Sequence, residues 1–254
     1  MRRFLTITMA LLLAVSTYSQ QKSDTMYVHM NDGSLKRIAV VAVDSVTFSS
    51  PSDFAPDHFP AEAIDLGLSV KWASCNVGAT SPEEYGGYYA WGETEEKDVY
   101  TWDTYKWCIN RNDYITKYCT KSTWGKVDNK IVLEPEDDVA HVKWGGGWRM
   151  PTHDEFKELF DKCDWTTTIV NDVPGYKVTG PNGNSIFLPA AGYRNHNSTK
   201  VIYRGSMGEY LSASLYDYRS DYAWGLYFYP KSYSRFNFDY SREEGLSVRP
   251  VCDK

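Results

Sequence analysis

The strongest local constraint on the fold is one amphipathic helix with a defined start. Thr152 is followed three residues later by Glu155, the pattern of a capping box in which each side chain bonds the other residue's backbone N–H. Apolar side chains then recur at helical spacing, at Phe156, Leu159, Phe160 and Cys163. The sequence therefore predicts a helix of about ten residues after Thr152.

Most of the remaining chain is typical of short strands joined by turns. Asn182-Gly183 marks the tip of a hairpin between strands at 176–179 and 185–188. Alternating apolar and polar residues predict a strand at 66–72, and we expect others at 210–215, 223–229 and 246–251. The segment 95–130 has no period and is expected to be a long irregular insertion. One or two helices, many short strands and long loops indicate the α+β class with mainly antiparallel strands.

The N-terminus predicts export. Arg2 and Arg3 precede an apolar run from Phe4 to Val15 and then small residues, which is the layout of a secretory signal peptide. The run is shorter than the roughly 20 residues that span a membrane, so no transmembrane segment is expected. Cleavage is expected after Ser19, with retention as an uncleaved anchor as the alternative. We expect a signal peptide at 1–19, a small β-hairpin module at 20–50 with a strand at 26–30 and one or two more at 35–48, a linker at 51–60 and the main domain at 61–254.

Composition narrows the class of partner. The net charge is −6, and it becomes more negative if Arg2 and Arg3 are removed, which disfavours binding to nucleic acid. Twenty tyrosines and nine tryptophans supply large amphipathic side chains, which suit both β-rich cores and binding surfaces.

Five cysteines in an exported chain make disulfides plausible and leave at least one thiol unpaired. Cys108 and Cys119 are the preferred disulfide pair, because they bracket a short polar loop. Cys75, Cys163 and Cys252 allow only one bond among them, and the spacing does not choose which. The wide spacings disfavour a zinc site, and no metal ligand is assigned.

Four separated motifs occur in a fixed order: LSVKWASCNVG at 68–78, GWRMPTHDE at 147–155, LPAAGYR at 188–194 and SVRPV at 247–251. Together they resemble the Fibrobacter succinogenes major paralogous domain family, over residues 64–252. The resemblance implies a C-type-lectin-like fold, shared with the formylglycine-generating enzymes. It also implies an exported protein of Bacteroidetes, in the periplasm or at the cell surface of a Gram-negative bacterium.

The sequence contains no recognisable catalytic pattern, and we expect a non-enzymatic protein. The histidines are scattered, and the cysteines do not reproduce the copper-binding pair of the formylglycine-generating relatives. An oxidase of that type is the lesser alternative. The acidic run at 134–138 superficially resembles the calcium motif of sugar-binding lectins, but it precedes the predicted helix and is interpreted as a solvated loop. No cofactor is expected, with Ca²⁺ as the lesser alternative.

The best candidate for a binding surface lies near the C-terminus, where aromatic residues alternate with Ser, Asn, Asp and Arg as in antibody paratopes. The candidate ligand-binding residues are Tyr216, Tyr218, Arg219, Tyr222, Tyr233, Arg235, Asn237 and Tyr240. The alternative is that these tyrosines are ordinary sheet residues. We expect a glycan or protein ligand, and the competing functional hypothesis is a structural component of the envelope or of fimbriae.

The residues just before the helix are assigned a structural role. Thr152 and Glu155 satisfy helix-end N–H groups, and Trp148 is large enough to anchor the loop in the core. Trp148, Arg149, Pro151, Thr152 and Glu155 are therefore predicted to support the fold, with a ligand contact by Arg149 as the alternative.

Overall fold

The computed structural model describes residues 25–29, 35–39, 61–109, 114–195, 200–230 and 235–254, with the backbone alone at 25–29, 35–39 and 235–238. The chain divides into two compact units, Met1–Asp53 and Phe54–Lys254, at a boundary inside the expected linker. In the first unit β1 (Thr25–His29) pairs antiparallel with β2 (Leu35–Ala39), which is the predicted hairpin. The expected signal peptide and residues 40–48 lie outside the described residues.

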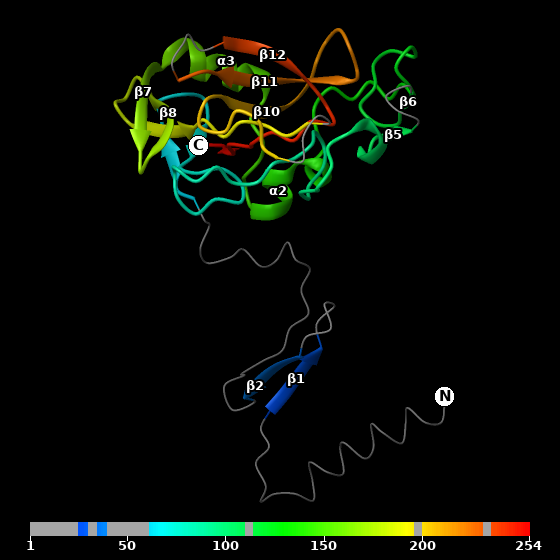
Figure 1. The fold of residues 1–254 in the computed structure, drawn as a ribbon, viewed down its shortest axis with the longest axis horizontal. Helices are drawn as coiled ribbons and strands as arrows, with labels where there is room; N and C mark the ends of the chain where they lie inside the picture. The colour runs from blue at the N-terminus through cyan, green and yellow to red at the C-terminus, as the bar shows by residue number, and fades with distance from the viewer. Residues whose placement is uncertain (1–24, 30–34, 40–60, 110–113, 196–199, 231–234) are drawn as a thin grey trace, which may run out of the picture. The chain divides into compact units, whose positions relative to one another are not determined.

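The second unit is built from short strands, two α-helices and two 3₁₀ turns within its described residues. In chain order these are β3 (Ala63–Asp65), β4 (Lys71–Ala73), η3 (Trp102–Thr104), β5 (Cys108–Ile109), β6 (Tyr114–Ile115), η4 (Pro135–Asp137), α2 (Val139–Trp144), α3 (His153–Lys162), β7 (Asp164–Val170), β8 (Val173–Thr179), β9 (Ser185–Pro189), β10 (Gly208–Leu215), β11 (Tyr222–Phe228), β12 (Arg235–Ser241) and β13 (Val251–Cys252). Figure 1 shows β7 and β8 at one end of this unit and β5 and β6 at the other.

The strands form three small sheets of three strands, in the orders β10-β11-β12, β13-β4-β3 and β7-β8-β9, and β5 pairs with β6. Each of these strand pairs is antiparallel. The predicted α+β class with mainly antiparallel strands is confirmed. The hairpin around Asn182-Gly183 is also confirmed, as β8 and β9.

Helix α3 packs on the sheet β10-β11-β12. It begins as the sequence predicts: the Thr152 side chain accepts from the Glu155 N–H, and the Glu155 carboxylate accepts from the Thr152 N–H. Its buried residues Phe156 and Leu159 pack in a core cluster with Leu226 and Phe228 of β11. One face of this sheet is thus covered by the helix.

The fourth motif of the family resemblance is joined to the first and second motifs through Arg249 and Val251. This arginine is fully buried, and its guanidinium donates to Asn76 Oδ1 (2.8 Å), to the carbonyl of Ala73 (3.0 Å) and to the carbonyl of Phe187 (2.9 Å). The second motif joins through paired backbone hydrogen bonds between Arg149 and Val251. Hydrogen bonds therefore join the first, second and fourth motifs, and the Phe187 carbonyl that accepts from Arg249 directly precedes the third motif.

The strand predicted at 66–72 is mostly absent, although the predicted alternation of buried and exposed residues is present. Lys71–Ala73 forms the strand β4, and residues 66–70 form the loop that joins β3 to β4, in which Gly67 takes a left-handed conformation (φ +79). Leu66, Leu68 and Val70 are nevertheless all buried, with exposed residues between them. The strand expected at 246–251 is likewise reduced to isolated bridges and β13.

Candidate functional site

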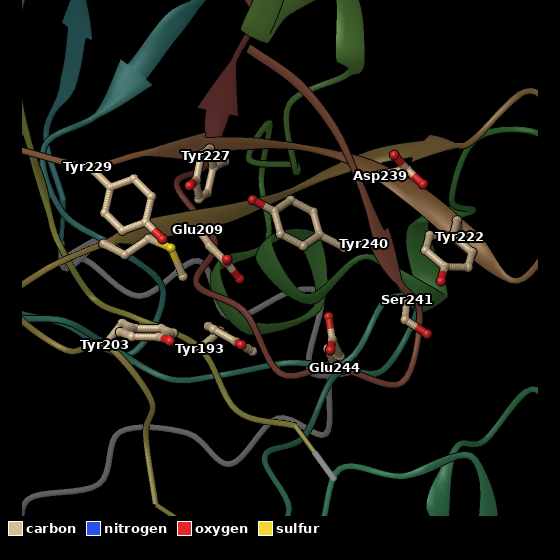
Figure 2. Close-up of a pocket in the computed structure, with 11 residues that line it drawn as sticks. Tyr193, Tyr203, Glu209, Tyr222, Tyr227, Tyr229, Asp239, Tyr240, Ser241 and Glu244 are labelled. Carbon is tan, nitrogen blue, oxygen red and sulfur yellow. The ribbon is translucent and has the colours of Figure 1, made fainter. Parts of the chain in front are cut away.

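A hollow of about 460 Å³ opens beside the sheet β10-β11-β12, and we call it the tyrosine pocket (Figure 2). Six tyrosines line it: Tyr193, Tyr203, Tyr222, Tyr227, Tyr229 and Tyr240. Three carboxylates line it as well: Glu209, Asp239 and Glu244. Among the described residues that line it there is no lysine or arginine. The pocket is therefore both aromatic and acidic.

Strand alternation places Glu209 and Tyr227 of this pocket on the sheet face opposite α3. Tyr210 of β10 belongs to the cluster that packs under α3, so the neighbouring Glu209 points to the other face. Glu209 lies directly opposite Tyr227 in the β10–β11 ladder. Gly225 makes room for Tyr240, because a Cβ at that position would lie 2.5 Å from the tyrosine ring.

The other wall of the pocket comes from the loop between β9 and β10 and from the turn after β12. Backbone hydrogen bonds in both directions between Arg194 and Gly245, each 2.8 Å long, hold the loop against the turn that carries Glu244. Tyr203 in this loop has a left-handed backbone conformation (φ +56), which is uncommon for a bulky residue. Its backbone carbonyl accepts from the N–H groups of Ser206 and Met207, and these bonds hold the strained turn in place.

Glu209 is the unusual group in the pocket. Its side chain is only 5% exposed, and its Oε2 has no hydrogen-bond partner among the described residues. Burial, with a smaller contribution from the nearby Glu244 carboxylate, raises the pKa of Glu209 to about 9. Burial, together with the charge of Glu243, raises the pKa of Glu244 to about 7. Figure 2 shows the Glu209 carboxyl group in the middle of the pocket, between the rings of Tyr193 and Tyr240.

The tyrosines form the walls around this carboxyl group. The rings of Tyr227 and Tyr229 meet edge to face with centroids 5.0 Å apart, and those of Tyr193 and Tyr203 are 6.2 Å apart. Burial raises the pKa of Tyr193 to about 12 and also raises that of Tyr240, so both remain neutral phenols near pH 7. The pocket thus presents ring faces and hydroxyl groups around buried carboxyl groups.

A second hollow of about 460 Å³ continues from the first. It shares Tyr222, Ser241 and Glu244 with the tyrosine pocket and extends to Trp102 and Asp103 of η3. The two hollows therefore adjoin at Tyr222, Ser241 and Glu244.

The structure divides the candidate ligand-binding residues into separate groups. Tyr222 and Tyr240 line the tyrosine pocket. Tyr216 and the 68% exposed Tyr218 belong to another aromatic cluster, in which Tyr216 contacts Trp224 and the Trp224 ring stacks on His153 at 4.2 Å.

Arg219 lies between these two groups. It is ion-paired with Asp221 at 2.6 Å, and its guanidinium lies over the rings of Trp124 and Tyr222. Tyr233 lies outside the described residues, and Arg235 and Asn237 are described only as backbone in β12.

Several residues of the pocket were not among those expected from the sequence. They are Tyr193, Tyr203, Glu209, Tyr227, Tyr229, Asp239 and Glu244. The clearest available signal was Glu209 itself, a lone carboxylate in the otherwise apolar or small strand Gly208–Leu215. A charged residue inside such a strand is costly to bury and is therefore a candidate for function.

The acidic run at 134–138 is not the solvated loop that the sequence suggested. Asp137 and Asp138 are buried, and carboxylate oxygens of Glu134, Glu136 and Asp137 lie within 4.8 Å of one another. Lys117 fills this cluster, with its Nζ 2.6 Å from both a Glu134 and an Asp137 oxygen. A lysine ammonium therefore supplies the positive charge that the calcium hypothesis assigned to a metal.

Asp138 instead has a structural role. Its carboxylate caps α2 by accepting from the N–H groups of Ala140 and His141, and it also accepts from the Met150 N–H. It thereby ties the start of α2 to the segment that leads into α3.

None of the five cysteines forms a disulfide in this structure, so the expected Cys108–Cys119 bridge is absent from it. Cys108 packs beside the cluster of Tyr88, Tyr100 and Tyr105, whereas Cys119 is buried with its Sγ 3.2 Å from the Lys121 carbonyl. The two thiols thus face different surroundings. Burial raises the pKa of Cys75, of Cys252 and of Cys163, the last to about 11, so these thiols carry little thiolate near pH 7.

The residues assigned a structural role lie in the core or at the helix start. Trp148 is 5% exposed and meets Trp144 edge to face. Arg149 forms a two-pronged ion pair with Glu155, at 2.6 and 2.8 Å, and contacts Asp253 at 3.2 Å. The Pro151 carbonyl accepts from the Ala213 N–H and so joins this segment to β10.

Within the part of the chain that the structure describes, no helix has the length and apolar character needed to cross a membrane. Comparison of the chain with protein-family models, with curated proteins and with solved structures found no match.

Proposed function

We propose that this chain is an exported, non-enzymatic binding protein that captures its ligand in the tyrosine pocket. The observation that carries the proposal is the buried Glu209 carboxyl group, which is set in an open hollow walled by tyrosine rings and whose Oε2 has no hydrogen-bond partner in the described part of the chain. Open pockets with aromatic walls and a few polar groups are the usual form of ligand sites.

The proposal includes membership of the major paralogous domain family and a C-type-lectin-like fold. Its support is the set of contacts at the fourth motif, where the buried Arg249 bonds Ala73 and Asn76 of the first motif and Val251 bonds Arg149 of the second. Export to the periplasm or the cell surface is supported by the N-terminal charge and hydrophobicity pattern. The motifs stabilise the scaffold and the tyrosine pocket supplies recognition.

The absence of turnover is part of the proposal. The thiols of Cys75, Cys163 and Cys252 have raised pKa values, which disfavours thiolate chemistry of the oxidase type. The carboxyl groups of Glu209 and Glu244 could in principle serve as an acid and a base. Recovery of the bound ligand in chemically altered form would therefore contradict the non-enzymatic proposal.

The test compares two exposed tyrosines, one inside the pocket and one outside it. Tyr203 is 55% exposed and lines the pocket, whereas Tyr218 is 68% exposed and does not. In Tyr203→Gly the ring is lost, while glycine adopts the left-handed backbone without strain, so the free energy of unfolding should change by no more than about 1 kcal/mol. Tyr218→Ala is the control.

The wild type and both variants are applied to glycan and peptide arrays. We expect the wild type and Tyr218→Ala to bind the same ligands and Tyr203→Gly to lose them. Loss of binding in Tyr218→Ala alone would place the site in the outer aromatic cluster instead. An array without any ligand for the wild type would contradict the binding function.

A further inference from the structure

The tyrosine pocket contains a buried carboxyl group that the described part of the fold does not fully satisfy with hydrogen bonds. Glu209 is only 5% exposed, and its Oε2 lacks a hydrogen-bond partner among the described residues. A buried carboxyl oxygen without a partner costs about 1–3 kcal/mol. Two further carboxylates, Asp239 and Glu244, line the same hollow. A ligand that supplies positive charge and a donor would remove this cost.

The same domain already uses this combination of groups to hold a cation of its own. The ammonium group of Lys117 lies between the carboxylates of Glu134 and Asp137, and it lies 4.9 Å from the ring centroid of Tyr118 and 5.1 Å from that of Trp107. Carboxylates and aromatic ring faces both attract a positive charge, and the attraction to a ring reaches about 2 kcal/mol when water is excluded. The tyrosine pocket offers equivalent groups with an open entrance.

An anionic ligand would lie beside Asp239 and two further carboxyl groups that can ionise, without a balancing lysine or arginine among the described lining residues. A neutral sugar could stack on the rings, but it would not relieve the proximity of Glu209 to Glu244. The combination of ring faces with acidic groups therefore favours a cation.

We propose that the tyrosine pocket recognises an organic cation, an alkylammonium or guanidinium group, which seats against the Glu209 carboxylate between the faces of Tyr193, Tyr227 and Tyr240. This inference rests on the proposed function, in that the pocket is the ligand site, and it adds the chemical class of the ligand. The group can belong to a small amine or to a lysine or arginine side chain of a protein. The continuation toward Asp103 and Glu243 accommodates the remainder of such a ligand.

Proton release provides a signature of this mode of binding. With a pKa of about 9, Glu209 is protonated in the empty pocket near pH 7, and a bound cation favours its ionised form. The other titratable groups that line the pocket are Tyr222 and Tyr227 on β11, Tyr229 just after it, Asp239 and Tyr240 on β12, Glu244 in the following turn, and Tyr193 and Tyr203 in the loop before β10. As pH rises toward the pKa of Glu209, the affinity for a cation should increase by up to about tenfold per pH unit. Ionisation of Glu244 as pH rises adds to the same trend.

The experiment is calorimetric titration of the purified full chain between pH 6 and 8. The probes are choline, its uncharged carbon analogue 3,3-dimethyl-1-butanol, the N-acetyl amides of lysine and arginine, and methyl glycosides as neutral polyols. We expect at least one cation to bind at least about tenfold more tightly than the uncharged analogue, with proton release. Tighter binding of the amino-acid amides than of choline would indicate a protein side chain as the natural source, and the reverse order would indicate a small amine.

Glu209→Gln keeps the shape of the side chain and removes its acidic proton, so it should reduce the cation preference about tenfold or more and leave only the smaller pH dependence that Glu244 contributes. Glu62→Gln, at an exposed site outside the pocket, is the matched control and should behave as the wild type. Binding of a glycoside that depends on Tyr203, with no cation preference, would overturn this inference and leave the proposed function intact. Absence of binding by every probe would overturn the cation inference, and the array test with Tyr203→Gly judges the proposed function separately.

Discussion

Replacing Glu209 by glutamine should change the pH dependence of stability in a direction set by burial. In the folded chain the pKa of Glu209 is about 9, against an ordinary value of 4.5. Because the folded state holds this proton more tightly than the unfolded state, stability is fully present below pH 4.5 and is lost as pH rises toward 9. Glutamine has no proton to lose and lacks this contribution.

The magnitude follows from the two pKa values. A group that titrates at about 9 when folded and 4.5 when unfolded lowers the free energy of unfolding by about 4 kcal/mol between pH 5 and pH 8. This is an upper estimate, because water that enters an open pocket weakens the penalty of burial. Other titrating groups are common to wild type and variant, so they largely cancel in the difference.

The assay is urea unfolding of wild type, Glu209→Gln and Glu62→Gln at pH 5, 6, 7 and 8 without ligand. Glu209→Gln should match the wild type near pH 5 and become progressively more stable than it toward pH 8, while Glu62→Gln follows the wild type throughout. A constant difference between wild type and Glu209→Gln at every pH would refute the reasoning, because it would mean that Glu209 titrates like an exposed carboxylate.

Three further outcomes test the scaffold by denaturant unfolding. Trp148→Ala should lower the free energy of unfolding by about 3–5 kcal/mol because the ring is buried. Thr152→Ala should lower it by only about 1 kcal/mol through the lost helix cap. Equal small decreases would mean that Trp148 is solvent-exposed. Arg249→Met should cost about 3 kcal/mol or more, because it leaves three buried acceptors unpaired. Although burial raises the pKa of Asp137, hydrogen bonds from Lys117, Tyr118 and Lys106 lower it overall, so Asp137→Asn should destabilise the chain at pH 7 and progressively less as pH falls below 4.

Local signals account for the parts of the fold that could be predicted. The capping box at Thr152 and Glu155 and the turn at Asn182-Gly183 involve neighbouring residues only, and both are present in the structure. The alternation at 66–72 correctly predicted burial, but residues 66–70 form a loop in which Gly67 takes a left-handed conformation. Helix α2 has only six residues, too few for a helical period to be recognised.

The tyrosine pocket could not be predicted from local patterns because its walls come from distant segments. Glu209 reaches Tyr227 only through the register of β10 with β11, and the loop that carries Tyr193 is fixed by the Arg194–Gly245 hydrogen bonds. The composition of the C-terminal stretch correctly indicated Tyr222 and Tyr240 as pocket residues. It could not separate them from Tyr216 and Tyr218, which differ from them in position and not in residue type.

The most direct test of the pocket as the ligand site is an NMR titration of the chain labelled at its tyrosine rings, with choline and N-acetyl-arginine amide as probes. Variants that replace single tyrosines assign the signals. The rings of Tyr203, Tyr227 and Tyr229 should shift together and saturably, while that of Tyr218 stays unchanged. Saturable shifts confined to Tyr216 and Tyr218, or the same shifts in Glu209→Gln, would contradict the account.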